Sequence, residues 1–280
     1  MNVTRTADRA DDTSVTVSVL IAAEPETVWR FLSDGDRFGA WIGAFAGQPP
    51  LPGTAVEPHV GGTIRVSYPT AEPGKTTAAR GEITAMEPLK RVAFSWGYEA
   101  GTHGLKPGAS QVEITLHPEA GGTRVCLRHT GLPGREAAQG HFSGWKHYLA
   151  MLARQASETQ QAESLPGVID TYFRAWREAD DAVRRQLLDA SCEPDVSIRS
   201  FWACTDGVDE LSAHIANGLR QMPGMTLRQE GPAQHLHGYA RVGWAVQTPD
   251  DKRVMGGTNM LRLSPRGRIA LAVSFAEASA

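Results

Sequence analysis

The sequence is short of cysteine, of surplus positive charge and of long hydrophobic runs. Its three cysteines, Cys126, Cys192 and Cys204, lie far apart and outside any CxxC or Cys/His array, which argues against a disulfide framework or a zinc site. The net charge of -3 excludes the broad basic field that attracts nucleic acid or anionic lipid. No stretch approaches the roughly 18 consecutive apolar residues of a membrane-spanning helix. We therefore expect a soluble, cytoplasmic protein, with neither nucleic acid nor a membrane as a partner.

Motifs for cofactors and metals are missing as well. The glycine pairs at residues 61–62 and 121–122 lack the strand-to-helix context of a dinucleotide-binding loop, and neither a P-loop nor an HExxH motif occurs. His235 and His237 form the closest histidine pair, at strand spacing, without a nearby acidic third ligand. The sequence thus predicts neither a cofactor nor a metal site.

What the sequence does contain is enough core material for two domains. With 280 residues, of which 41% are hydrophobic and 21% charged, the chain is too long for one ordinary hydrophobic core. Residues 1–13 are charged and lack the apolar core of a secretory signal, so they predict a disordered tail. Residues 156–164 are polar, which is typical of a helix end that leads into a linker. We therefore expect domains at residues 14–155 and 165–280.

The first domain shows the pattern of an antiparallel sheet packed on a long helix. A strand at residues 14–21 precedes a helix that begins near Pro25, and a loop at residues 38–62 carries large apolar groups. Phe142 and Trp145 belong to an apolar stripe at helical spacing near the end of the domain. Consecutive strands separated by turns are predicted at residues 63–68, 76–86, 91–98, 110–117 and 123–130. The predicted fold class of this half is α+β, with an antiparallel meander.

Several short motifs of this half occur together in one known superfamily. They are AEPETVW at residues 23–29, Trp41, Gly61-Gly62, GEI at residues 81–83, RVAFSW at residues 91–96, and Gly144-Trp145 with Tyr148-Leu149. With this set the domain resembles the START-like superfamily, and most closely its branch of heat-shock ATPase activator homologues. The resemblance implies a helix-grip fold, in which a curved antiparallel sheet grips the long C-terminal helix around a ligand cavity. Ile42 follows Trp41 where a second tryptophan is common in the family.

The second half begins again with helices and ends in strands. Apolar stripes predict helices around Tyr172 and Leu187, and a short strand at residues 196–201 leads to a third helix at residues 208–219. Turn residues then separate four strands, which are predicted at residues 225–236, 239–247, 253–263 and 268–275. This pattern indicates a second α+β domain.

This half also carries a series of motifs in a familiar order. They are YFRAW at residues 172–176, Leu187-Leu188, Gly207 with Leu211, His237-Gly238 with Arg241 and Trp244, Gly257-Thr258, and GRI at residues 267–269 with Phe275. In this order they resemble the SnoaL-like branch of the nuclear transport factor 2-like superfamily. The resemblance implies a cone of helices against a strongly bent sheet with a pocket at one end, and a possible homodimer through the sheets. Members include polyketide cyclases, isomerases, dehydratases and binding modules without catalysis, so the fold alone assigns no reaction.

The sequence offers few groups for catalysis in such a cone. Enolate and aldol chemistry needs a carboxylate or histidine base, and a donor that holds the oxyanion. Members of the family often carry an aspartate at the strand that here reads RSFWAC at residues 199–204, whereas Asp206 is displaced toward the next helix. A second, frequently acidic position is Asn259. The candidates for catalysis are therefore His237, Arg241 and Asn259, with an exposed turn as the alternative for His237 and a structural ion pair for Arg241.

Aromatic residues supply the candidates for ligand binding in both domains. Core packing is the alternative for each of them, because core and cavity walls are largely the same surface in such folds. His141 lies one helical turn before Trp145 and is the polar candidate of the first domain. The candidates are Trp41, Phe94, Trp96, His141 and Trp145 in the first domain, and Tyr172, Trp176, Trp202 and Trp244 in the second.

These features predict a two-domain protein that encloses small apolar or aromatic molecules, with no assigned reaction. A polyketide cyclase, isomerase or dehydratase of secondary metabolism is the alternative that both resemblances imply. A chaperone-interacting module is a third hypothesis, implied by the family branch that the first domain resembles.

Overall fold

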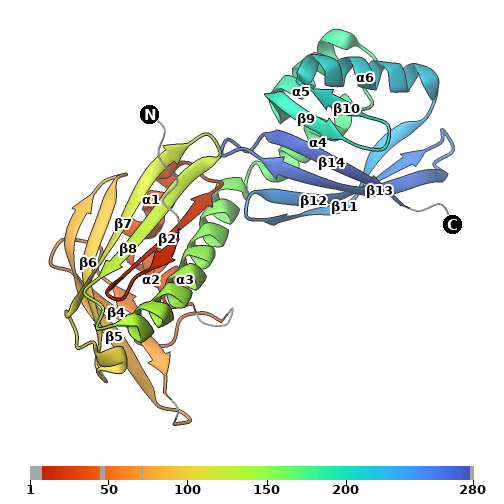
Figure 1. Ribbon diagram of the computed structural model, residues 1–280. Coiled ribbons are helices and arrows are strands. Elements are labelled where there is room, and N and C mark those ends of the chain that lie inside the picture. Colours follow the sequence, from red (N-terminus) through yellow and green to blue (C-terminus); the bar gives the residue numbers. More distant parts are fainter. Residues whose placement is uncertain (1–7, 45–47, 71, 278–280) are drawn as a thin grey trace. The chain divides into compact units, whose positions relative to one another are not determined.

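The structure is a computed structural model that describes residues 8–44, 48–70 and 72–277. The chain divides into two compact units, which are Met1–Ala156 (unit 1) and Ser157–Ala280 (unit 2). Each unit combines a sheet with helices, as Figure 1 shows, so the predicted α+β class is confirmed for both. Among the described residues, no helix combines the length and the apolar composition needed to cross a membrane.

Unit 1 is built on an eight-stranded antiparallel sheet in the order β1-β2-β8-β7-β6-β5-β4-β3. Side chains alternate between its two faces, so that Val15 and Val17 of β2 are buried in the core. The strands from β4 to β8 pair in chain order, which confirms the predicted meander. The bounds are β1 Arg9–Ala10, β2 Ser14–Ile21, β3 Ala55–Val56, β4 Thr63–Pro69, β5 Thr76–Glu87, β6 Arg91–Tyr98, β7 Ser110–Glu119 and β8 Gly122–Thr130.

The longest helix of unit 1, α3, lies along the sheet (Figure 1). It packs Trp145, Leu149 and Leu152 into the core that the strands form. The shorter α2 starts where the Asp34 carboxylate accepts a hydrogen bond from the Arg37 backbone N–H at 2.9 Å and thereby caps the helix. A sheet that holds a long helix in this way is the expected helix-grip arrangement. The bounds are α1 Pro25–Ser33, α2 Gly35–Ile42, η1 Thr102–Gly104 and α3 Arg135–Gln161.

The predicted disordered tail at residues 1–13 is wrong for residues 8–13. Arg9 and Ala10 form β1 and pair with Thr16 and Val15 of β2. The Asp8 carboxylate also accepts a hydrogen bond from a backbone N–H of that strand, at 2.8 Å. Two paired residues are too few to show a strand period in the sequence, which explains the error. Residues 1–7 lie outside the described residues.

The predicted loop at residues 38–62 is wrong at its start. Phe38, Trp41 and Ile42 belong to α2 and are completely buried. α2 has only eight residues, or less than three helical turns, which is too short for a clear helical period. The many glycines and prolines that follow it also favoured the prediction of a loop. Residues 45–47 of the predicted loop lie outside the described residues.

The segment at residues 156–164, predicted as a helix end that leads into a linker, is helical for most of its length, because α3 continues to Gln161. Ala156, Ser157 and Gln161 are buried despite the polar composition of the segment. The Gln161 side-chain amide donates a hydrogen bond to the Ser264 carbonyl at 3.1 Å, and this bond compensates for part of its burial. The polar composition of this segment therefore reflects side chains that are buried with hydrogen-bond partners, and it does not by itself indicate a linker.

Unit 2 is built on a six-stranded sheet in the order β10-β9-β14-β13-β12-β11. The strands β11 to β14 form an antiparallel meander, and β9 joins β14 in parallel. Register shifts interrupt the β11–β12, β12–β13 and β13–β14 pairs, and such bulges bend a sheet. The bounds are β9 Cys192–Arg199, β10 Cys204–Asp206, β11 Thr226–Leu236, β12 Tyr239–Gln247, β13 Arg253–Leu263 and β14 Ile269–Ala276.

The helices of unit 2 pack on the inner face of this sheet, where Tyr172, Leu188 and Leu211 join one buried cluster with Val242 and Leu261 of the strands. Asp180 caps the N-terminus of α5, because its carboxylate accepts hydrogen bonds from two backbone N–H groups of the first turn, at 2.9 Å each. The bounds are α4 Leu165–Ala175, α5 Asp181–Ser191 and α6 Val208–Gln221.

Candidate functional site

Unit 1 contains a cavity of about 500 Å³ between β4, β5, β6, η1 and α3. This volume falls within the range of small-molecule sites. Of the described residues that line the cavity, none is an aspartate, glutamate, lysine or arginine. Its aromatic side chains are Tyr68, Trp96, Tyr98, His103, His141, Trp145 and Tyr148.

Next to this cavity, a chain of hydrogen bonds holds His129 in one protonation state. Trp145 Nε1–H donates to His129 Nδ1 at 3.0 Å, so Nδ1 carries no proton. The Ser110 hydroxyl donates to the Trp96 carbonyl at 2.9 Å, and its oxygen lies 2.8 Å from His129 Nε2, where it accepts the Nε2–H. Burial, with a smaller contribution from His141, lowers the pKa of His129 to about 3. His129 is therefore a neutral, structural group near pH 7.

His141, the predicted polar candidate, lines the cavity and bonds to Tyr98. Its Nδ1 lies 2.7 Å from the Ala137 carbonyl oxygen, which only accepts, so Nδ1 carries the proton of the neutral ring. Nε2 therefore accepts, and the Tyr98 hydroxyl donates to it at 3.1 Å. Burial lowers the pKa of His141 and raises the pKa of Tyr98 to about 12, so both groups are neutral near pH 7. The Tyr98 proton is thus committed to His141.

The rest of the polar lining consists of two further tyrosines, His103 and the threonines Thr70, Thr77 and Thr102. The Tyr148 hydroxyl donates to the Tyr68 hydroxyl at 3.3 Å, and burial raises the pKa of both groups. His103 is exposed on η1 and has a left-handed backbone with φ of 56°, which costs energy in any residue other than glycine. Its ring centroid lies 5.2 Å from that of His141. A Cβ at Gly140 would lie 3.3 Å from the His103 ring, so the glycine makes room for it.

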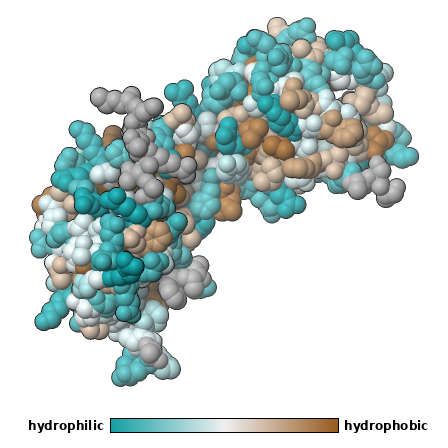
Figure 2. All heavy atoms as spheres, in the orientation of Figure 1, coloured by the Kyte–Doolittle hydropathy of each residue, from teal (hydrophilic) through white to brown (hydrophobic). Residues whose placement is uncertain are grey.

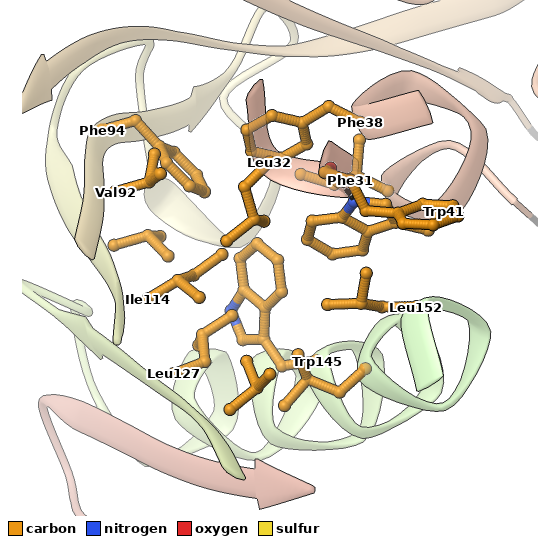
Figure 3. Packing of buried hydrophobic residues seen from close by; sticks show 14 of the residues in the cluster. Phe31, Leu32, Phe38, Trp41, Val92, Phe94, Ile114, Leu127, Trp145 and Leu152 are labelled. Atoms are coloured by element: carbon orange, nitrogen blue, oxygen red, sulfur yellow. Dashed lines mark hydrogen bonds between the residues drawn. The ribbon is translucent and has the colours of Figure 1, made fainter. Parts of the chain in front are cut away.

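Two of the five ligand-binding candidates in unit 1, Trp41 and Phe94, lie in the core and do not line the cavity (Figure 3). Trp41 is completely buried and stacks on Phe38 with 5.2 Å between ring centroids. Phe94 packs edge-on against Trp96 and Trp145, at 6.0 and 6.5 Å. Core packing therefore accounts for these two residues, whereas the other three candidates line the cavity.

Unit 2 contains a second cavity, of about 480 Å³, between α4, α6 and the inner face of its sheet. Met222, Met225 and Met255 contribute flexible thioethers to its wall. The Trp244 indole packs against Gly257, where a Cβ would lie 2.6 Å from the ring. Of the described lining residues, again none is an aspartate, glutamate, lysine or arginine. All four ligand-binding candidates of this half line it, and they are Tyr172, Trp176, Trp202 and Trp244.

Asn259, one of the three candidates for catalysis, lies on the wall of this second cavity beside Ser274 of the neighbouring strand. Asn259 is only 5% exposed. None of the side-chain hydrogen bonds among the described residues involves Asn259 or Ser274. A carboxamide offers a donor and an acceptor but cannot act as a base at neutral pH. The pair is therefore suited to holding a neutral polar group and not to proton abstraction.

The structure does not bring the other two candidates for catalysis, His237 and Arg241, to either cavity. His237 is exposed in the turn between β11 and β12, with a left-handed φ of 51°. Arg241 is exposed on β12 and faces away from Val242, which is the register partner of Asn259 on the inner face. The exposed-turn alternative therefore fits His237, and Arg241 belongs to the outer face of the sheet.

The displaced carboxylate of Asp206 does not reach the second cavity either. It accepts hydrogen bonds from the Ser197 hydroxyl at 2.7 Å and from the Arg199 guanidinium at 2.8 Å, which lower its pKa and join β10 to β9. Within the described part of the chain, no group of three or more histidine, cysteine, aspartate or glutamate side chains is placed to hold a metal ion.

Sequence reasoning missed Tyr68, Tyr98, Ser274 and the three cavity methionines as site residues. Tyr98 was detectable, because it lies two residues after Trp96 in one strand and therefore on the same face. Ser274 follows similarly from its pairing with Asn259, but only once the strand register is known. Met222 and Met225 lie beyond the end of α6, where no period marks which way a side chain points.

Unit 1 is similar to one known protein family. A family model described as "Activator of Hsp90 ATPase homolog 1-like protein" matches residues 22–156, which is nearly all of unit 1 and just under half of the chain. No curated protein matches the sequence.

Several solved structures are similar to parts of the chain. One, from Agrobacterium tumefaciens and described as belonging to the SnoaL-like family, is 26% identical, covers 43% of this chain and 99% of its own, and has a TM-score of 0.39. A protein from Rhodobacter sphaeroides is 26% identical and covers 51% of this chain and 91% of its own, with a TM-score of 0.41. A protein from Mycobacterium smegmatis is 22% identical and covers 56% of this chain and 98% of its own, with a TM-score of 0.43.

Proposed function

We propose that this chain, whose unit 1 is a domain of the Activator of Hsp90 ATPase homolog 1-like family, binds small, uncharged, largely apolar or aromatic molecules in two separate cavities. One observation carries the proposal. Cavities of about 500 and 480 Å³ are walled by aromatic and apolar side chains, and no aspartate, glutamate, lysine or arginine occurs among their described lining residues. Apolar walls favour ligands that lose little hydration on entry.

The titratable groups of both cavities support an uncharged ligand. Burial lowers the pKa of His141 in unit 1 and of His214 in unit 2, so both rings are neutral near pH 7. Burial also raises the pKa of Tyr98 and of Tyr172. A charged ligand would therefore enter without a counter-charge, which is costly in an apolar site.

The same chemistry favours binding over an acid-base reaction. A cyclase, isomerase or dehydratase of the expected type needs a base beside the reacting carbon. The one imidazole among the described lining residues of the second cavity, His214, is not joined there by an aspartate or glutamate that would orient it as a base, and the Asn259 carboxamide cannot act as one. We propose that Asn259 and Ser274 hold a carbonyl or amide group of the ligand there.

The proposal can be tested on the full chain with tryptophan residues labelled with nitrogen-15. The indole signals of Trp96 and Trp145 report the first cavity, and those of Trp176 and Trp244 report the second. Trp29 lines neither cavity and serves as the internal control. Each signal is assigned by a tryptophan-to-phenylalanine substitution.

Two probes of matched shape decide the outcome. N-phenyl-1-naphthylamine is uncharged, and 8-anilinonaphthalene-1-sulfonate is its sulfonated relative. We expect the neutral probe to shift the cavity signals saturably. The anionic probe should bind at least about tenfold more weakly, because no lysine or arginine occurs among the described lining residues of either cavity to pair with its sulfonate. Equal affinity for the two probes, or no saturable shift at either cavity, would contradict the proposal.

We also propose that unit 2 forms a homodimer through the outer face of its sheet. Leu236, Tyr239, Met260 and Phe275 are 55, 49, 38 and 60% exposed, and the strand register places all four on that face. Figure 2 shows hydrophobic residues on the surface of unit 2 among hydrophilic ones. Substituting Phe275→Glu should shift the sedimentation coefficient of the full chain toward that of a monomer, and an unchanged coefficient would contradict this interface.

A further inference from the structure

The polar end of the first cavity has a fixed hydrogen-bond polarity. The Ala137 carbonyl holds the proton of neutral His141 on Nδ1, and the Tyr98 hydroxyl is therefore obliged to donate to Nε2. What Tyr98 presents to the cavity is then its oxygen, with a lone pair and no proton. Trp96 Nε1–H lies near this hydroxyl and lowers the pKa of Tyr98, but it makes no hydrogen bond of acceptable geometry to a described residue, so the Tyr98 oxygen keeps a lone pair for a ligand. A ligand group that meets Tyr98 must consequently be a donor.

Tyr68, on the neighbouring wall, has the opposite polarity. Its oxygen accepts from the Tyr148 hydroxyl at 3.3 Å, so its own proton is not used in that bond. The ring centroids of Tyr68 and Tyr98 lie 6.3 Å apart, and both side chains line the same cavity. One wall thus offers a free donor and the other a free acceptor. A hydroxyl group is the simplest neutral group that satisfies both.

We infer that the first cavity selects aromatic ligands that carry a free hydroxyl group, and that this hydroxyl donates to the Tyr98 oxygen. The inference rests on the proposed function of unit 1 and narrows it to a ligand class. The ring systems of Trp96 and Trp145, with centroids 5.4 Å apart, provide the apolar wall for the aromatic body. His141 is a positioning residue, because it acts on the ligand only through the direction of the Tyr98 proton.

The hydroxyl is bound in its protonated form. A phenolate would bring a negative charge to the Tyr98 oxygen, which has no proton left to donate, and no described lining residue is a lysine or an arginine. A carboxylic acid meets the same obstacle once it ionises. The chemical class is therefore a neutral phenol or alcohol on an aromatic frame.

The experiment compares 2-naphthol with 2-methoxynaphthalene, which has the same frame but no proton to donate. Binding is followed on the nitrogen-15 indole signals of Trp96 and Trp145 in the full chain, so that ligand in the second cavity does not enter the measurement. We expect the wild-type protein to bind 2-naphthol about tenfold more tightly, as one neutral hydrogen bond allows. Tyr98→Phe keeps the ring and should reduce the preference to nearly one.

Two controls make the result specific. Tyr239→Phe removes a tyrosine hydroxyl that lines neither cavity, and it should leave the tenfold preference intact. His141→Asn should lower the preference without abolishing binding of 2-methoxynaphthalene, because the Tyr98 hydroxyl is then free to rotate. A purely structural role for His141 would weaken both ligands equally.

The possible outcomes separate the inference from the function on which it rests. If both ligands bind the first cavity with equal affinity, or if Tyr98→Phe keeps the preference, the hydroxyl inference is overturned and ligand binding by unit 1 stands. If neither ligand shifts the Trp96 and Trp145 signals, both the inference and the proposed function of unit 1 are overturned.

Discussion

The two cavities have nearly the same volume, about 500 and 480 Å³, but their polar groups are organised differently. In unit 1 the polar side chains bond to one another, and the chain through His129 ties the cavity wall to the core. In unit 2, Asn259 and Ser274 are bonded to no described side chain and stand on an apolar wall. The volume of a site therefore says little about its recognition, which depends on which donors and acceptors the protein leaves unused.

The cavities also differ in whether the residues of their walls belong to the hydrophobic core. Trp96 and Trp145 are 1 and 2% exposed and belong to the main cluster of unit 1, so its cavity wall is part of what keeps the unit folded. Trp202 of the second cavity is 54% exposed beside Phe201, which is 85% exposed. Changes to the wall should thus be costly for stability in unit 1 and tolerated at the rim in unit 2.

The largest expected effect on stability that tests this difference between the two cavities is that of Trp145→Ala. Removing a buried tryptophan from a packed core costs about 3–5 kcal/mol of unfolding free energy, and the Trp145 hydrogen bond to His129 is lost as well. Trp202→Ala, at an exposed position, should change stability by less than about 0.5 kcal/mol. Chemical denaturation of the two variants measures both values. A similar cost for the two substitutions would remove the distinction between the cavities.

The next effect is a dependence of unit 1 stability on pH. The pKa of His129 falls from its ordinary 6.5 to about 3 in the folded protein. Between these values the unfolded chain binds a proton that the folded unit does not, so stability falls with falling pH, by about 1.4 kcal/mol per pH unit from this group. Above pH 6.5 the contribution is complete. His141, whose pKa is also lowered, acts in the same direction.

The measurement is a series of denaturation curves between pH 4.5 and 7. This range extends to about two pH units below the ordinary histidine pKa. His129→Gln should be less stable than wild type at pH 7, because the hydrogen-bond chain is broken, but its stability should depend less steeply on pH. Equal slopes in the two proteins would show that folding does not lower the pKa of His129.

A smaller effect is expected in unit 2 from Asn259→Leu. The substitution removes an almost buried amide that has no partner among the described side chains, so stability should be unchanged or slightly higher. Binding of 2-naphthamide, followed on the indole signals of Trp176 and Trp244, should weaken about tenfold, while naphthalene binding stays the same. A loss of affinity for both ligands would mean that Asn259 shapes the cavity and does not hold a polar group.

The smallest expected effect on stability and on ligand binding is that of Arg241→Ala. Because Arg241 is exposed on the outer face of β12, the substitution should change stability by less than about 0.5 kcal/mol and leave ligand binding in unit 2 unaltered. The Asn259→Leu protein provides the comparison. If Arg241→Ala weakens binding as strongly as Asn259→Leu, the two faces of this sheet are not independent.

The order and class of most elements followed from the sequence alone, whereas β1 and α2 did not. Alternating valines predicted β2 over residues 14–21, and turn residues separated the strands of both meanders, because period and turn chemistry are local properties. The same reasoning identified most of the cavity aromatics, since large apolar side chains at helix and strand spacing must face inward.

The tertiary structure alone decided which of these side chains became core and which became site. Trp41 and Trp96 were both candidates for ligand binding, yet Trp41 packs on Phe38 and Trp96 faces a cavity, because that outcome depends on how the elements pack together. The direction of the Tyr98 proton was likewise invisible, since it is set by a carbonyl at Ala137 on another element. Patterns along the chain determine which residues point inward, and only the packed fold determines what they meet there.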